Sequence, residues 1–234
     1  QTLKEIVFNK EFNSYEVKHV QELVEKHYWI FGEQYNLITS AEPDFELALK
    51  GMIKAEMGIE EEVHIEHPDK NKEMDLYMIR QDRQGRVTEN VVVELKRPKI
   101  KLGEKELSQV KKYMRVIKNT PRFNAGNVKW TFYLVGNEFD KSLYIPGELE
   151  SHKFLGEQHL VHCQDNGLTK IYVLKWSEIF DDYSKRHDFL MEHLKLEEKL
   201  WLETHESADD AVTAVENNSA TLPEAIIPKN QKVV

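Results

Sequence analysis

The sequence predicts an α/β protein in which a central mixed β-sheet is flanked by helices. Three observations lead to this class. Amphipathic helical patterns occupy both ends of the first 203 residues, strand patterns occupy the middle, and one helical pattern separates two of the strands. This order of helices, a strand hairpin, a helix, a strand and a closing helix is typical of an α/β sandwich with a mixed sheet.

Two amphipathic helices are expected before the first strands. The first covers residues 14–27, where Asn13 and Glu16 have capping-box spacing and the apolar residues share one side. The second begins after Pro43, carries apolar residues at helical spacing and ends at Gly58. Because a one-sided apolar stripe needs a partner surface, both helices are expected to pack on a sheet.

The strand patterns follow these helices. A short strand is expected at 63–65, and residues 74–80 have the alternation of a strand ahead of a turn at 82–85. The run at 91–95 is β-branched and nearly continuous, which is typical of a central strand covered on both faces. Pro98 ends this strand, because proline cannot donate to a ladder.

The remaining elements complete the expected domain. Downstream of the central strand we expect a helix at 103–119, a strand at 128–135, two short strands at 160–163 and 171–174, and a closing helix at 177–203. One domain is therefore expected over 1–203, made of N-terminal helices at 1–58, a catalytic core at 59–135, and C-terminal strands and a helix at 136–203. Residues 204–234 are rich in small and acidic residues and predict an acidic flexible tail.

Composition narrows the class of protein. Apolar residues make up 40% of the 234 residues, which is enough for a folded core, and no apolar run reaches the ~18 residues of a membrane span. The single cysteine, Cys163, cannot form an intramolecular disulfide, and no signal peptide is visible, so a cytoplasmic location is expected. The chain begins at Gln1 without a methionine, from which we expect a piece of a longer protein.

Charge is unevenly distributed along the chain. The formal net charge of −9 argues against a protein that coats nucleic acid nonspecifically. Between Lys96 and Lys129, however, eleven basic residues occur with only two acids. Two interpretations are open: a solvated helix face, or a basic strip that binds the phosphates of a nucleic acid.

The residues suited to chemistry lie on the two strands of the expected hairpin. Glu94 and Lys96 are two residues apart in an apolar strand and so project from the same face. If the hairpin pairs, Asp75 converges with Glu94. Two carboxylates and the Leu95 carbonyl would form an oxygen-rich site suited to Mg²⁺ or Mn²⁺. Such a metal would activate water and neutralise charge on a phosphate, with Lys96 assisting the attacking water.

The tripeptide Glu-x-Lys is not specific by itself. It occurs again at 16–18 and 197–199, both within expected helices. Only Glu94 and Lys96 interrupt a hydrophobic strand that an aspartate precedes at hairpin distance, where unpaired buried charge is costly. A structural ion pair between Glu94 and Lys96 or Arg97 is the alternative interpretation.

These residues resemble the motif set of a known superfamily. The pattern is similar to that of PD-(D/E)XK nucleases with a Gln-x-x-x-Tyr helix motif, and it is carried by Asp75, Glu94, Leu95, Lys96, Gln109 and Tyr113. The resemblance implies a restriction-endonuclease-like three-layer sandwich. It implies a catalytic set of Asp75, Glu94, Lys96 and Gln109, and a metal bound by Asp75, Glu94 and Leu95. The chain departs from the superfamily's name at Met74, where the first motif has a proline.

A narrower resemblance is to the Shedu-type antiphage nuclease domain. It rests on Tyr28–Tyr35 and on Val93–Pro98, and it spans residues 28–135. It implies a DNA endonuclease in bacterial antiphage defence, with a regulatory or ATPase domain N-terminal to this chain. Nucleases of this kind often act in pairs, so a homo-oligomer is expected. An additional metal-supporting acid from an early helix is common in the superfamily, and Glu33 and Glu46 are the two candidates.

Beside such a site, the basic strip is expected to contact DNA. The expected nucleic-acid-binding residues are Lys101, Lys105, Lys111, Lys112, Tyr113 and Arg115. Tyr113 can instead belong to the core and Gln109 to a solvated helix face. Two other functions stay open, a catalytically silent nucleic-acid-binding or assembly module and a ribonuclease.

Other sites are expected to be absent. His64, His67 and Asp69 are close in sequence but lack a cysteine pair, so a surface turn is expected there and not a zinc site. No Gly-rich phosphate loop is present, so ATP binding is not expected within this chain.

Overall fold

The computed structural model describes residues 7–8, 17–39, 44–58, 60, 62–69, 73–124 and 128–204. The chain divides into two compact units, Gln1–Tyr183 and Ser184–Val234. The first unit holds all strands of the described residues, and the described part of the second is the C-terminal part of one long helix, α6 (Trp176–Thr204). The expected start of the first helix at 14–16 and the expected tail beyond Thr204 lie outside the described residues.

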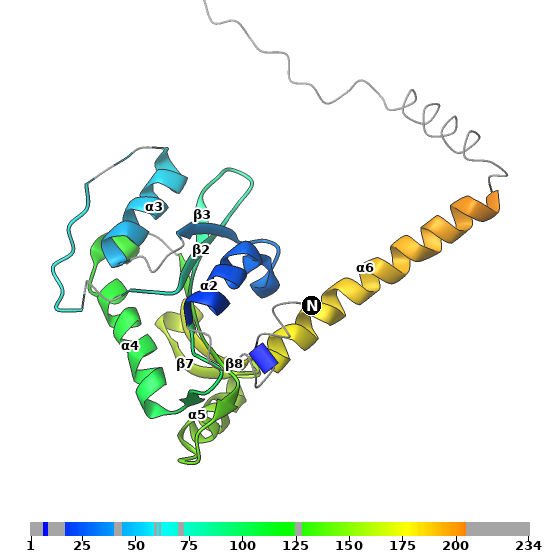
Figure 1. Ribbon diagram of the computed structural model, residues 1–234. Coiled ribbons are helices and arrows are strands. Elements are labelled where there is room, and N and C mark those ends of the chain that lie inside the picture. Colours follow the sequence, from blue (N-terminus) through cyan, green and yellow to red (C-terminus); the bar gives the residue numbers. More distant parts are fainter. Residues whose placement is uncertain are drawn as a thin grey trace, which may run out of the picture. The chain divides into compact units, whose positions relative to one another are not determined.

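A six-stranded mixed sheet organises the first unit (Figure 1). Its order is β1-β2-β3-β5-β8-β7. The strands are β1 (Asn36–Thr39), β2 (Leu76–Gln81), β3 (Val87–Leu95), β5 (Lys129–Gly136), β7 (Leu160–Gln164) and β8 (Thr169–Lys175). Neighbours from β1 to β3 are antiparallel, β3, β5 and β8 run parallel, and β7 is antiparallel to β8. The predicted mixed sheet is confirmed.

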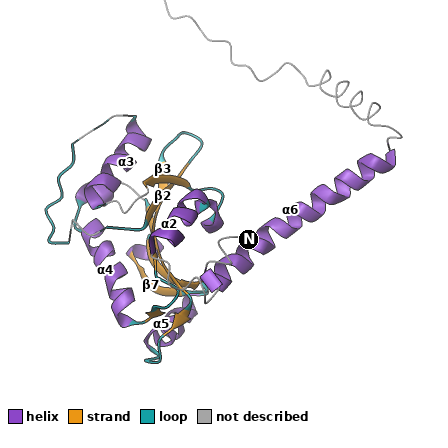
Figure 2. Cartoon of the chain, in the orientation of Figure 1, coloured by secondary structure: helices purple, strands orange, loops and turns teal. Residues whose placement is uncertain are grey.

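Helices cover both faces of the sheet and give the predicted three layers (Figure 2). Two helices, α3 (Phe45–Met57) and α4 (Glu104–Lys118), pack on one face, while α2 (Val17–Lys26) and the first residues of α6 pack on the other. Each face has its own apolar core, because side chains alternate across every strand. Residues 90–95 of β3 are all buried, as predicted for a central strand covered on both sides.

The shorter elements complete the chain. They are a helix α5 (Tyr144–His152), a two-stranded parallel sheet of β4 (Lys101–Leu102) and β6 (Glu138–Phe139), and 3-10 turns η2 (Tyr28–Phe31), η3 (Pro121–Asn124), η4 (Lys153–Leu155) and η5 (Asp165–Gly167). Within the described part of the chain, every helix is too short or too polar to cross a lipid bilayer.

The β2–β3 hairpin has the predicted turn. The Asp82 side chain accepts the backbone amides of Gln84 at 2.8 Å and Arg86 at 3.0 Å. Gly85 has a φ of 80°, a conformation that suits glycine. The turn therefore sets the register in which Leu76 lies opposite Val93.

The start of α4 is fixed by a close approach at Gly103. A Cβ on this residue would lie 2.1 Å from an Asp140 carboxylate oxygen, so no larger residue fits without movement. Glu106 reaches back to accept the Gly103 amide at 3.1 Å and caps the helix. These contacts determine where α4 begins, and hence which of its side chains reach the end of β3.

The structure corrects some of the expected elements. Residues 63–65 form no strand, because the Ile65 amide donates to Glu46 Oε1 at 2.9 Å and not to a neighbouring strand. The strand expected at 74–80 begins at Leu76, so Asp75 lies directly before it. The edge strand β1, the helix α5 and the pair β4–β6 were not expected from the sequence.

Candidate active site

Glu94 and Lys96 lie at the end of the central strand, on the side covered by α4. Val92 packs in the α3–α4 core, and Glu94, two residues on, points the same way. The backbone amide of Lys96 donates to Val135 at 2.8 Å and so continues the pairing with β5. The Lys96 ammonium lies 2.6 Å from Glu94 Oε1. The ion pair named as the alternative is therefore present, and its surroundings decide what it can do.

Asp75 lies at the same end of the sheet, next to the end of β3. Since Leu76 lies opposite Val93, the preceding residue falls next to the end of β3 that carries Glu94. The Oδ2 atom of Asp75 accepts the backbone amide of Leu95. Asp75 is 8% exposed and Glu94 is 5% exposed. The hairpin thus brings two buried carboxylates to one end of the sheet.

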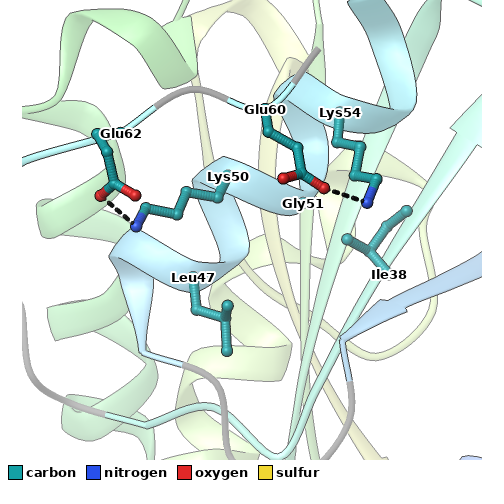
Figure 3. A pocket seen from close by; sticks show the side chains of 7 residues that line it. All are labelled: Ile38, Leu47, Lys50, Gly51, Lys54, Glu60 and Glu62. Carbon is teal, nitrogen blue, oxygen red and sulfur yellow. Dashed lines mark hydrogen bonds and ion pairs between the residues drawn. The ribbon is translucent and has the colours of Figure 1, made fainter. Parts of the chain in front are cut away.

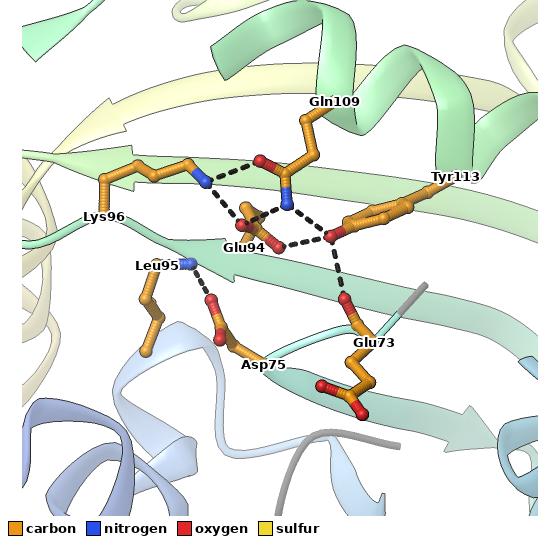
Figure 4. A network of polar contacts seen from close by, with 7 residues as sticks. All are labelled: Glu73, Asp75, Glu94, Leu95, Lys96, Gln109 and Tyr113. Carbon is orange, nitrogen blue, oxygen red and sulfur yellow. Dashed lines mark hydrogen bonds and ion pairs between the residues drawn. The ribbon is translucent and has the colours of Figure 1, made fainter. Parts of the chain in front are cut away.

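Gln109 and Tyr113 lie one turn apart on α4 and both reach Glu94 (Figure 4). Gln109 Oε1 accepts from Lys96 at 2.7 Å, and its Nε2 donates to Glu94 Oε1 at 2.8 Å and to the Tyr113 hydroxyl at 2.6 Å. That hydroxyl lies 2.9 Å from Glu94 Oε2 and 2.8 Å from the Glu73 carbonyl, and its one proton serves one of them at a time. Helix α4 therefore fixes the orientation of the Glu94 carboxylate and the Lys96 ammonium.

Burial controls the protonation of this network. It raises the pKa of Glu94 above its ordinary value, while Lys96 and the hydrogen bonds from Tyr113 and Gln109 oppose the rise. The pKa of Tyr113 is also raised, first by burial and then by the charge of Glu94. Tyr113 is therefore a neutral hydroxyl at physiological pH. A cation next to Glu94 would favour the ionised carboxylate.

An open cavity of about 400 Å³ lies over these groups, lined by Glu73, Asp75, Glu94, Leu95, Lys96, Arg97, Ile100 and Gln109. Its carboxylate oxygens are the ligands that Mg²⁺ and Mn²⁺ prefer. Within the described ranges, no cluster of three His, Cys, Asp or Glu residues forms a closed metal cage. Two carboxylates still fit Mg²⁺, because this ion keeps several waters and binds proteins through one or two carboxylates.

The cavity does not include either acid proposed for an early helix. Glu46 accepts the Ile65 amide at 2.9 Å, and Glu33 is exposed in the turn after η2. The acid that lines the cavity alongside the buried pair is Glu73. This residue lies just before the strand expected at 74–80 and belongs to none of the motifs, so nothing in the sequence selected it.

The six residues expected to bind nucleic acid separate into three groups. Tyr113 is 1% exposed, and its hydroxyl belongs to the network around Glu94. Lys101 and Lys111 each form an ion pair with a glutamate of another element. The other three residues, Lys105, Lys112 and Arg115, are exposed.

Three further residues of the site come from the structure. Gln21 of α2 is buried, and its Nε2 donates to the Asp75 carbonyl at 3.2 Å. Its position within the apolar stripe of the first helix was the available signal, because a buried amide needs a partner. Arg97 and Ile100, in the loop after β3, line the cavity at its edge.

Comparison with known proteins gives a match to one family. The family model for the N terminus of the Type I restriction enzyme R protein matches residues 50–134, a little over a third of the chain. No curated protein and no solved structure matches. The matched segment contains Asp75, Glu94, Lys96, Gln109 and Tyr113. It relates this part of the chain to restriction enzymes and is compatible with a nuclease-related role and an interaction with DNA.

Proposed function

We propose that this chain is a divalent-metal-dependent DNA endonuclease domain of the PD-(D/E)XK superfamily, most like the Shedu-type nucleases. The observation that carries the proposal is that Asp75, Glu94 and Lys96 line one cavity, where Gln109 joins the last two. The match to a restriction-enzyme family over the same segment supports it. A buried structural ion pair also needs hydrogen bonds to its charged groups, but it does not need the second carboxylate and the open cavity beside it.

The two carboxylates and the Leu95 carbonyl are the groups that would hold Mg²⁺ or Mn²⁺. When bound, such an ion polarises a phosphate oxygen and lowers the pKa of water. The Leu95 amide fixes Asp75, and α4 fixes Glu94, so both carboxylates are oriented before any ligand arrives. Orientation in advance lowers the reorganisation needed for catalysis.

Lys96 supplies the positive charge of the site. Its ammonium lies between Glu94 and Gln109 at 2.6 and 2.7 Å and lines the cavity. In the proposed reaction it orients the attacking water and stabilises the charge that develops on the phosphate oxygens. Gln109 and Tyr113 act through Glu94 and Lys96, and we assign them as positioning residues.

A plasmid-cleavage assay tests the proposal. The purified chain is expected to nick or cut DNA with Mg²⁺ or Mn²⁺ and to be inactive in EDTA, and the Glu94→Ala variant is expected to be inactive with both ions. Glu60→Ala, which removes an exposed acid of the segment after α3, is the matched control and should retain full activity. Cleavage by the Glu94→Ala variant at the wild-type rate contradicts the proposal, and cleavage of RNA alone replaces DNA with RNA as the substrate.

The biological setting follows from the same resemblance. We propose antiphage defence in the bacterial cytoplasm, with cleavage controlled by a regulatory or ATPase domain of the full protein and with two copies acting together. The role in antiphage defence is tested by an infection assay. It compares cells that carry the wild-type full-length protein with cells that carry its Glu94→Ala variant. Protection by the variant equal to that by the wild type contradicts a defence role for cleavage.

A further inference from the structure

We propose that Lys105 and Lys112, which flank Gln109 on α4, bind the substrate phosphates on either side of the one that enters the cavity. This inference rests on the proposed function, since it assigns the course of the DNA strand over that site. It divides the basic strip into residues that contact DNA and residues that hold the fold together.

The spacing along α4 places the two lysines on the cavity side. Lys105 precedes Gln109 by four residues and Lys112 follows it by three, and residues at these separations share one side of a helix. Gln109 lines the cavity, so the two ammonium groups lie on both sides of it along the helix axis. Seven residues at about 1.5 Å each separate them by about 10.5 Å along the helix axis.

Neither of these two lysines is paired with an acid in the described part of the chain. Both are exposed, and neither side chain has an ion pair or a hydrogen bond within the described ranges of the chain. On a different side of the same helix, Lys111 lies 3.8 Å from Glu148 and Lys118 lies 2.6 Å from Asp165.

The paired lysines join α4 to its neighbours. Lys118 contacts the η5 turn, where it holds the pKa of Asp165 below its ordinary value, and Lys111 contacts α5. Their charge is therefore partly neutralised by acids of the chain itself. An unpaired cation next to the cavity has a larger net attraction for phosphate than a cation already paired with a carboxylate.

The test compares two double variants of one helix. Lys105→Gln with Lys112→Gln removes the unpaired charges, and Lys111→Gln with Lys118→Gln removes two paired charges with the same change in net charge. Binding to a short DNA duplex is measured in EDTA, so that cleavage does not interfere, over a range of salt concentrations. The slope of log K against log salt is negative, and each lost phosphate contact reduces its magnitude by about 0.9, so the first pair should reduce it by about 1.8.

The control pair is expected to leave the slope unchanged, and Lys105→Arg with Lys112→Arg should keep the wild-type slope. Circular dichroism spectra establish that each variant is folded. Equal slopes for the two Gln pairs overturn the inference, because α4 would then act only through its total charge, and an unchanged slope for the first pair overturns it as well.

The outcomes for binding and for cleavage are separable. If the slopes differ as expected but the wild type does not cut DNA with Mg²⁺, the surface stands as a DNA-binding site and the nuclease proposal fails. If the wild type cuts DNA while the two pairs have the same slope, the nuclease proposal stands and the course of the strand is wrong.

Discussion

In the part of the chain that the structure describes, the hollow over α3 and the cavity at the end of β3 both contain acid–base pairs, but these pairs differ in burial and in the number of groups that share them. The larger, about 550 Å³, lies over the outer surface of α3 and is lined by Ile38, Leu47, Lys50, Gly51, Lys54, Glu60 and Glu62 (Figure 3). In it each lysine forms a separate exposed pair with one glutamate, both at 2.6 Å. In the cavity at the end of β3, one lysine and two helix side chains share a buried glutamate.

The difference shows that the volume of a hollow does not indicate whether its charged groups can act as a functional site. Exposed pairs contribute little to stability and neutralise each other, and nothing holds their long side chains in one geometry. Around Glu94 the low exposure strengthens every polar contact, and three elements fix the positions of the charges. Burial and shared partners, more than the size of a hollow, are therefore what mark this candidate site.

The largest expected effect separates the two hollows directly. Asp75→Asn, Glu94→Gln and Lys96→Ala should each lower kcat/KM for DNA cleavage by about a hundredfold to a thousandfold, because each removes a charge placed for the transition state. Glu62→Gln, the matched change in the other hollow, should leave kcat/KM unchanged. Equal losses in both sets would show that cleavage does not depend on the buried network, and thermal unfolding identifies any variant that loses its fold.

Replacement of Mg²⁺ by Ca²⁺ tests whether the cavity at the end of β3 is a metal site. Ca²⁺ binds oxygen ligands in a looser geometry with more ligands, so it should support DNA binding while cleavage is lost. Binding is measured with Ca²⁺ and cleavage with either ion, for the wild type and for Glu94→Gln. Cleavage in Ca²⁺ at the Mg²⁺ rate contradicts the expected octahedral requirement of the site.

Intermediate effects are expected from the positioning residues. Gln109→Ala and Tyr113→Phe should each lower metal affinity or cleavage by about tenfold to a hundredfold, as loss of an outer hydrogen bond to a metal ligand typically does. Tyr113→Phe should also lower the free energy of unfolding by about 1 kcal/mol, since it removes a buried hydroxyl that has partners. Urea unfolding and Mn²⁺ titration measure the two quantities. A loss of stability with wild-type metal affinity and wild-type cleavage would make Tyr113 a structural residue only.

The smallest effect is expected in the hollow over α3. Lys54 holds the pKa of Glu60 below its ordinary value. Lys54→Gln should therefore raise the pKa of Glu60 back toward that value while cleavage and its salt dependence stay unchanged. A proton–carbon NMR titration of Glu60 follows the pKa. If cleavage falls as well, this hollow takes part in function.

Much of the site could be predicted because it lies on elements with strong local patterns. The buried run of β3 and the apolar stripe of α4 specify their own orientation, and the turn at 82–85 fixes the hairpin. The hairpin and its turn bring Asp75 next to Glu94, whereas the place of Gln109 beside them was expected only from the resemblance to PD-(D/E)XK nucleases. The helix spacing of Gln109 and Tyr113 also follows directly from the sequence.

The other parts depend on contacts that no local pattern contains. Residues 63–65 have the composition of a strand, but the Ile65 amide donates to the Glu46 side chain of α3 and not to a neighbouring strand. Strand β1 has only four residues and forms by pairing with β2. Whether a lysine of the basic strip is paired depends on acids such as Glu148 and Asp165, which follow it by 37 and 47 residues.

The way Asp75 is held has a thermodynamic consequence. Gln21 of α2 holds its carbonyl, the Leu95 amide of β3 holds its carboxylate, and Tyr113 of α4 contacts the residue two before it, Glu73. These groups lie far apart in the unfolded chain, so the metal ion proposed to bind between the two carboxylates would select the folded state alone. Each tenfold rise in free ion concentration above its Kd would then add about 1.4 kcal/mol to the stability of this domain.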